Sequence, residues 1–295
     1  MRNISAENIT DAVIARFENC GNPRLKEVME ALVRHTHGFI REVKLTEAEW
    51  MGGIKFLTQT GLKCTGQRQE FILLSDTLGV SMLVTAMNNE YPAGATEATV
   101  FGPFHTEDMP LAESGADIAG DAPGEPLFVD CQVNGLGGEP VANAEVDVWQ
   151  ADDDGLYDVQ RPELGDTRRA RARMHTDAGG NLKFRTVVPT PYPVPTDGPV
   201  GAMLLATGRH PWRPAHLHFR IRATGYSTLI THIFREPDPY LDSDAVFGVR
   251  SSLIGEFVEH APGVAPDATT QAQRYFALTQ QVVLARVPVP VPAPA

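Results

Sequence analysis

The spacing of apolar residues changes once along this chain, near residue 91, and that change limits the folds it can adopt. Before that point the spacing is helical, and Asn22-Pro23 is a typical helix start. One apolar stripe follows, made of Leu25, Val28, Met29, Leu32, Val33, Ile40 and Val43. Thr46 and Glu49 have the spacing of a capping box, which predicts a second helix. Residues 70–76 are expected to continue into another helix that runs through Met87.

After a connection rich in Gly, Pro, Ala and acidic residues (92–125), the apolar period becomes two, which is typical of strands. We expect strands at residues 127–133, 144–149, 182–188, 216–222, 228–234 and about 275–284. Short strands separated by turn signals, such as Asp177-Ala178-Gly179-Gly180, favour an antiparallel β-sandwich. The fold class is therefore predicted to be α+β. Its parts would be a helical N-terminal domain (1–95), a β-sandwich domain (96–286) and an extended proline-rich tail (287–295).

Composition excludes several classes of partner. The 295 residues carry a formal net charge of -12, which argues against a surface for nucleic acids or anionic membranes. No apolar run approaches the length that a membrane span needs, and the first residues lack the apolar core of a signal peptide. The three cysteines, Cys20, Cys64 and Cys131, are odd in number and far apart, as in a reducing compartment. We expect a cytoplasmic enzyme.

The pattern His216-Leu217-His218 raises the question of a metal site. In a strand, successive side chains point to opposite faces, so His216 and His218 would share one face while Leu217 and Phe219 pack on the other. The two imidazoles either hold a metal or are chance polar residues on a wet face of the sheet. A ferrous site commonly includes a carboxylate beside the histidines, and a structural zinc site would use cysteines; neither lies nearby.

Two tyrosines occupy unusual positions. Tyr157 follows a predicted strand and an acidic loop, and Tyr192 stands between prolines, which fix the direction of the backbone. Taken singly, Tyr157 is better explained as an aromatic residue that packs at the sandwich edge, and Tyr192 as a ring that stacks among prolines. Each is also a candidate phenolate ligand.

The segments WQADDDGLYD, VVPTPYPVP and HPWRPAHLHFRI together resemble the intradiol ring-cleavage dioxygenases, which open catechols between their two hydroxyls. The resemblance covers nearly the whole chain, and it implies one Fe(III) per chain, bound by Tyr157, Tyr192, His216 and His218. It also implies that Arg213 stabilises negative charge on the reacting substrate and that Tyr192 leaves the metal and accepts a substrate proton. His232 is expected to contact the substrate or an intermediate. The residues expected around the substrate ring are Leu73, Asp76, Val100, Phe101, Gly102, Pro193, Val194 and Val246.

Within this family, HGFIREV, LTE and DSDAVFGV are most similar to hydroxyquinol 1,2-dioxygenases. The expected reaction therefore inserts both atoms of O₂ into hydroxyquinol (benzene-1,2,4-triol), with Asp76 as a partner for the third hydroxyl. Catechol or a chlorocatechol is the alternative substrate. A zinc hydrolase and a non-catalytic binding module are alternatives of other classes. The resemblance also implies that residues 96–286 form the catalytic domain and residues 1–95 the dimerisation domain. The homodimer would form through the N-terminal helices, whose apolar groove can hold a lipid.

Overall fold

The computed structural model describes residues 2–66 and 68–287. Within it the chain divides into two compact units, with the boundary between Gln59 and Thr60, inside one helix. The predicted domain boundaries at residues 95 and 286 stay predictions, and the predicted tail, apart from Val287, lies outside the described residues.

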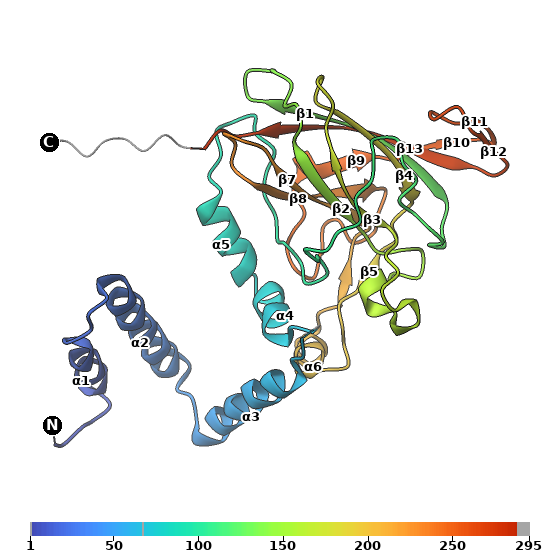
Figure 1. Cartoon of the computed structure of the whole chain (residues 1–295). Coiled ribbons are helices and arrows are strands. Elements are labelled where there is room, and N and C mark those ends of the chain that lie inside the picture. Colours follow the sequence, from blue (N-terminus) through green and yellow to red (C-terminus); the bar gives the residue numbers. More distant parts are fainter. Residues whose placement is uncertain (1, 67, 288–295) are drawn as a thin grey trace, which may run out of the picture. The chain divides into compact units, whose positions relative to one another are not determined.

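The first unit is helical (Figure 1). Its elements are α1 (Ile9–Ile14), the short 3-10 helix η1 (Ala15–Phe17), α2 (Pro23–Val43) and the beginning of α3 (Glu47–Lys63). Both predicted helix starts are confirmed. The Asn22 Oδ1 atom accepts a hydrogen bond from the Leu25 backbone N–H at 3.1 Å. Thr46 and Glu49 form the reciprocal capping box, with hydrogen bonds of 2.8 and 3.3 Å.

The predicted apolar stripe of α2 lies on the surface, because α2 has no buried residue. Its side chains Leu25, Leu32 and Val43 are each at least half exposed, at 51%, 55% and 50%. Most of this apolar face is therefore left uncovered by the other helices of the first unit.

In the second unit, residues 70–88 form two helices, α4 (Glu70–Thr77) and α5 (Val80–Asn88), as predicted. The break lies at Gly79, whose φ of 72° is left-handed and disfavours any residue with a Cβ atom. Of the described helices, none is long and apolar enough by itself to cross a membrane. α4 and α5 meet that test only as a pair, and they are bent by 76°.

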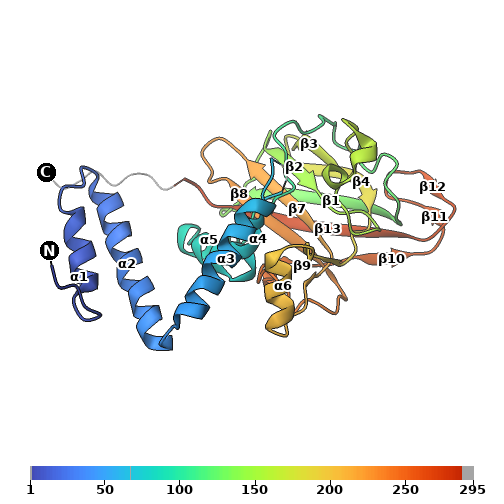
Figure 2. The same cartoon turned by 90° about the horizontal axis from the view of Figure 1, so that it is seen from below.

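Two sheets stack face to face in the second unit, as Figures 1 and 2 show. The first has the order β10-β13-β1-β4, formed by Val258–His260 (β10), Tyr275–Leu284 (β13), Pro126–Gly135 (β1) and Asn181–Val187 (β4). The second has the order β3-β2-β7-β8-β9, formed by Arg171–His175 (β3), Glu145–Trp149 (β2), His216–Arg222 (β7), Leu229–Glu236 (β8) and Ile254–Glu256 (β9). Smaller elements are β5 (Tyr192–Pro193), β6 (Trp212–Arg213), β11 (Gly263–Val264), β12 (Thr270–Gln271), α6 (Pro199–Ala206) and the 3-10 helices η2 (Asp158–Gln160), η3 (Pro162–Leu164) and η4 (Ser251–Leu253).

The inner faces of both sheets meet in one apolar core. Alternate residues of each strand contribute to it, for example Val129 and Cys131 from β1 and Leu217 and Phe219 from β7. The predicted α+β class with a β-sandwich is confirmed, with one difference. β1 pairs with β13 and β8 pairs with β9 in parallel, so both sheets are mixed. A parallel pair needs a long connection, and about 140 residues separate β1 from β13.

The outer face of the five-stranded sheet carries the polar residues. Trp149 of β2 lies opposite His218 of β7, and His218 lies opposite His232 of β8. All three side chains are buried, because the loops around the sheet cover this face. The fold therefore places a row of aromatic and imidazole rings between a sheet and its covering loops.

The turn before β4 allows a test of how closely this turn packs against the backbone of β1. An added Cβ at Gly180, where φ is 75°, would overlap the carbonyl oxygen of Val133, whereas one at Gly208 (φ 70°) would meet open space. We expect Gly208→Ala to lower the free energy of unfolding by about 1–2 kcal/mol, the cost of a left-handed residue. Gly180→Ala should cost about 1–3 kcal/mol more because of the overlap. Urea denaturation of both variants measures this difference, and equal losses would contradict the described turn.

Candidate metal centre

The two histidines of β7 lie on one face of the strand, as predicted. His216 and His218 point to the outer face of the sheet, and Leu217, Phe219 and Ile221 point into the core. The Nε2 atoms of His216 and His218 are 3.1 Å apart. The ring of His218 also stacks on Trp149, with centroids 4.6 Å apart and planes 14° from parallel.

Tyr157 reaches the same point from the loop after β2. It precedes η2, and its backbone N–H donates to the Gln160 side chain at 2.9 Å. Asp158, the next residue, forms a buried ion pair with Arg171 of β3, which anchors the loop to the sheet. The phenol ring stacks on Phe104 at 4.4 Å between centroids. Tyr157 is thus held by both its backbone and its ring.

Tyr192 arrives on the two-residue strand β5, where it lies opposite Arg213 of β6. Its Cβ atom lies close to Gly155, because a Cβ added to that glycine would be 2.9 Å away. Gly155 has a φ of 74°, so a residue without a side chain is required there for two reasons. The loop that carries Tyr157 and the strand that carries Tyr192 are therefore in direct contact.

Four donor atoms from these elements converge. The Tyr157 hydroxyl lies 2.7 Å from His218 Nε2 and 3.2 Å from the Tyr192 hydroxyl, and His216 Nε2 lies 3.1 Å from His218 Nε2. First-row metals bind imidazole and oxygen donors at about 2.0–2.2 Å, which places neighbouring ligand atoms about 3 Å apart. The four predicted ligands are therefore brought together with separations that fit one metal ion.

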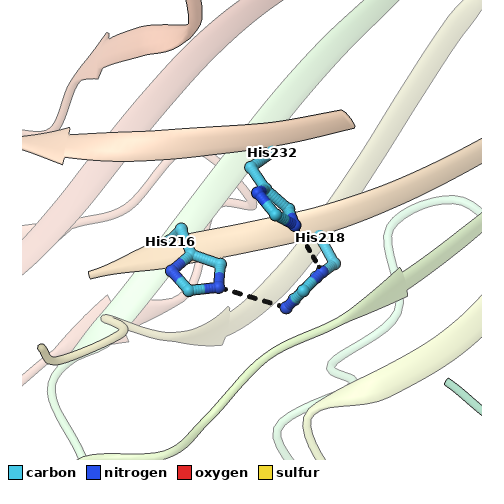
Figure 3. Close-up of side chains that lie close together, drawn as sticks. All are labelled: His216, His218 and His232. Atoms are coloured by element: carbon cyan, nitrogen blue, oxygen red, sulfur yellow. Dashed lines mark hydrogen bonds between the residues drawn. The ribbon is translucent and has the colours of Figure 1, made fainter. Parts of the chain in front are cut away.

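Three histidines of the outer face, His216, His218 and His232, also form a cluster of potential metal ligands. They do not converge on one point. As Figure 3 shows, His216 approaches His218 at Nε2, whereas His232 approaches the opposite nitrogen, Nδ1, at 2.8 Å. Because one imidazole offers one lone pair, His218 can share a metal with His216 or with His232, but not with both. The two tyrosines lie on the His216 side.

Burial keeps the imidazoles neutral. Burial and the nearby Arg213 guanidinium lower the pKa of His216 to about 3. Burial, His232 and His216 lower the pKa of His218 well below its ordinary value. Neutral imidazole is the form that binds metals, so both rings are ready to act as ligands.

Tyr157, in contrast to the histidines, must lose a proton and become charged before it can bind a metal as phenolate. Burial and the neighbouring Tyr192 raise the pKa of Tyr157 well above 10. Even an unperturbed phenol costs roughly 4 kcal/mol to ionise at pH 7. A phenolate at this position therefore requires a cation of high charge, and a hard ferric ion fits this donor set better than zinc.

Arg213 is fixed beside the tyrosines. Its Nε donates to Asp244 at 3.0 Å, and its Nη1 lies 3.5 Å from the Tyr192 hydroxyl. Burial opposes ionisation of Asp244, but Arg213 outweighs it and lowers the pKa of that carboxyl. Asp244 had no role in the sequence analysis, although it lies in the DSDAVFGV segment quoted there. Only the fold brings it to Arg213.

A cavity of about 820 Å³ meets this group of donor residues at Tyr192, the one of the four that lines it. Of the residues expected around a substrate, those that line it are Leu73, Asp76, Val100, Gly102, Val194 and Val246, together with Tyr192 and Arg213. Phe101 and Pro193 are not among its lining residues; Phe101 packs on His105 and Trp149 instead. His232 does not line the cavity either, and it is fully buried.

Comparison with known proteins agrees with this site. Residues 100–284 match the dioxygenase family, and residues 22–96 match the catechol dioxygenase N terminus. The chain belongs to the intradiol ring-cleavage dioxygenases. This confirms the expected enzyme class and, with it, an aromatic substrate and O₂. The family is generally iron-dependent, which agrees with the buried cluster of imidazole and phenol groups.

Its similarity to hydroxyquinol 1,2-dioxygenases is also confirmed. The chain is 57% identical over 263 residues to the 6-chlorohydroxyquinol 1,2-dioxygenase of Cupriavidus pinatubonensis, covering 89% of this chain and 95% of that protein. It is 54% identical to the hydroxyquinol 1,2-dioxygenase of Nocardioides simplex, covering 88% of each. The crystal structure of hydroxyquinol 1,2-dioxygenase from Pseudomonas putida matches with a TM-score of 0.87 and 48% identity, over 96% of this chain and 99% of that one.

Proposed function

We propose that this intradiol dioxygenase uses one Fe(III) per chain to cleave hydroxyquinol between two adjacent hydroxyls, giving 3-hydroxy-cis,cis-muconate, a tautomer of maleylacetate. The observation that carries the proposal is the convergence of Tyr157, Tyr192, His216 and His218 beside the cavity. When bound, Fe(III) supplies the charge that keeps the phenols ionised and activates the ring toward O₂.

The two tyrosines differ in a way that supports separate roles. Tyr192 lines the cavity, whereas Tyr157 is fully buried and does not. An entering substrate hydroxyl therefore meets Tyr192 first. We assign to the Tyr192 oxygen the acceptance of a substrate proton and to Tyr157 a permanent place as ligand.

Arg213 would stabilise negative charge on the substrate. Its guanidinium lines the cavity next to Tyr192, and Asp244 holds its orientation. A fixed donor in a water-poor site is worth more than one in solution, because no reorganisation is needed when the charge develops.

Asp76 is the proposed partner of the third hydroxyl. It lies in the cavity wall among the apolar side chains of Leu73, Val100 and Val246. Burial raises the pKa of Asp76, while Ser81 and Arg213 act in the opposite direction. The adjacent segment is held firmly, since Arg209 donates to the carbonyl oxygens of Thr77 at 2.6 Å and Ala245 at 3.0 Å. We propose Gly102 and Val194 as further substrate contacts, and the roles of Phe101 and Pro193 stay predictions.

A homodimer is proposed from the exposed apolar face of α2. A lipid in a groove of the helical segment and a cytoplasmic location stay predictions.

Replacing Tyr157 tests the metal centre. We expect Tyr157→Phe to lose most of its iron and the visible phenolate-to-iron absorption, because one charged ligand is removed. Tyr192→Phe should keep part of its iron, since three protein ligands remain, but lose activity. Tyr275→Phe, a buried tyrosine whose hydroxyl donates to the Val264 carbonyl, serves as the control. Metal analysis of the purified variants measures their iron content, and visible spectra measure the phenolate-to-iron absorption. A colourless iron-loaded wild type, or stoichiometric zinc, would contradict the proposal.

Substrate choice is tested at Asp76. A buried hydroxyl without a partner costs roughly 1–3 kcal/mol, so Asp76→Ala should lower kcat/KM for hydroxyquinol about ten-fold or more. The loss on catechol should be smaller, and Asp76→Asn, which keeps a hydrogen-bonding group, should lie between. Oxygen uptake with hydroxyquinol, 6-chlorohydroxyquinol, catechol and 4-chlorocatechol gives the comparison. Equal losses of kcat/KM on hydroxyquinol and catechol would show that Asp76 supports the fold and does not bind the third hydroxyl. A wild type that prefers catechol would refute hydroxyquinol as the substrate.

The dimer is tested on α2. We expect wild-type protein at micromolar concentration to sediment as a dimer whose apolar interface buries more than about 1,500 Å². Leu25→Glu/Leu32→Glu should shift it to monomer, because two charges would enter that interface. Glu27→Gln, which removes an exposed ion pair with Arg24, should leave the dimer intact. A wild type that sediments as a monomer would refute the proposal.

A further inference from the structure

We propose that His232 and Thr99 are positioning residues that hold His218 in the one tautomer able to bind the metal. The proposal rests on the metal centre argued above. It gives His232 a role other than the substrate contact expected from the sequence.

The three side chains form a continuous buried relay. His218 Nδ1 lies 2.8 Å from His232 Nε2, as the dashed line in Figure 3 shows. His232 Nδ1 lies 3.2 Å from the Thr99 hydroxyl oxygen. All three residues are at most 2% exposed. Water therefore has little access to replace a missing partner.

The direction of the relay follows from the chemistry of imidazole. A neutral ring carries one proton, so one nitrogen donates and the other accepts. If His218 offers the lone pair of Nε2 to the tyrosine side, its Nδ1 carries the proton and donates to His232 Nε2. His232 then carries its own proton on Nδ1 and donates to the Thr99 oxygen. The reverse arrangement puts a proton on His218 Nε2, where it would block metal binding.

His216 shows why His218 needs this support. His216 Nδ1 lies 2.7 Å from the backbone carbonyl oxygen of Pro214, which can only accept. The backbone therefore fixes the tautomer of His216, and Nε2 carries the lone pair. His218 has no such carbonyl partner among the described hydrogen bonds, so side chains must fix its tautomer.

The surroundings of His232 favour this positioning role over a contact with the substrate. His232 has no exposed surface, does not line the cavity, and uses both ring nitrogens in the relay. A substrate in the cavity could reach it only by displacing part of the site. Partners that orient a metal-bound histidine typically change metal affinity by about 10–100-fold when they are removed.

Thr99 gives the sharpest test, because Thr99→Val preserves shape and removes only the hydroxyl. We expect Thr99→Val to weaken ferric iron binding about ten-fold, since His232 then favours the reverse proton arrangement. Thr99→Ser should restore most of the affinity. The matched control is Thr231→Val, which removes a buried hydroxyl of β8 itself. That hydroxyl donates to the Glu97 carbonyl oxygen and is not part of the relay. Competition with a chelator measures the dissociation constants in the full-length protein.

Variants of His232, and the tautomer of His218 measured without metal, test the proposal further. His232→Gln keeps an acceptor for His218 Nδ1–H and should bind iron more tightly than His232→Leu. In the metal-free full-length protein, nitrogen-15 NMR should show the Nδ1–H tautomer of His218 in the wild type and a shift toward Nε2–H in Thr99→Val. Equal iron affinities in Thr99→Val and Thr231→Val, or an unchanged His218 tautomer, would overturn the proposal. Because NMR reads the tautomer without metal, failure of the relay is distinguishable from failure of iron to bind.

Discussion

The rest of the site depends on the burial of two phenol groups beside two imidazoles. Water cannot stabilise phenolate there, and burial raises the pKa of Tyr157 well above that of a free phenol. A phenolate at Tyr157 therefore needs a nearby positive charge, which a metal cation held by the four donor atoms would supply. The same burial keeps His216 and His218 neutral, and therefore available as ligands. One physical cause, the exclusion of water, thus keeps the two imidazoles neutral and makes a Tyr157 phenolate dependent on a positively charged partner.

The fold produces this burial by using the two faces of one sheet differently. The inner face of β7 fills the core, and its outer face carries the histidines. Three structures from distant parts of the chain complete the outer side: the Tyr157 loop, the Tyr192 strand and the segment that carries Thr99. Buried ion pairs hold two of them, Arg171 with Asp158 and Arg213 with Asp244. Such pairs add little net stability, but breaking one leaves a buried charge, so they fix geometry.

The sequence predicted the features that depend on the spacing of residues within one segment. The alternation in β7 gave the shared face of His216 and His218, and the signals at Asn22 and at Thr46 with Glu49 gave two helix starts. It missed β3, because the segment Arg171-Ala172-Arg173-Met174-His175 alternates with only two apolar residues, one of them a small alanine. Its two arginines pair with Asp158 and Asp147, which lie in other segments. It also missed the parallel pairing of β1 with β13 and the Arg213–Asp244 contact. These depend on long-range packing, which the spacing of residues along one segment does not encode.

The central claim is that one metal ion binds Tyr157, Tyr192, His216 and His218 together. Anomalous diffraction from crystals of the protein as purified, with data on both sides of the iron and zinc absorption edges, tests it most directly. We predict a single iron peak about 2.0–2.2 Å from the two tyrosine oxygens and the two histidine Nε2 atoms, with His232 outside bonding distance. A zinc signal, or a metal bound by His232 in place of the tyrosines, would contradict the account.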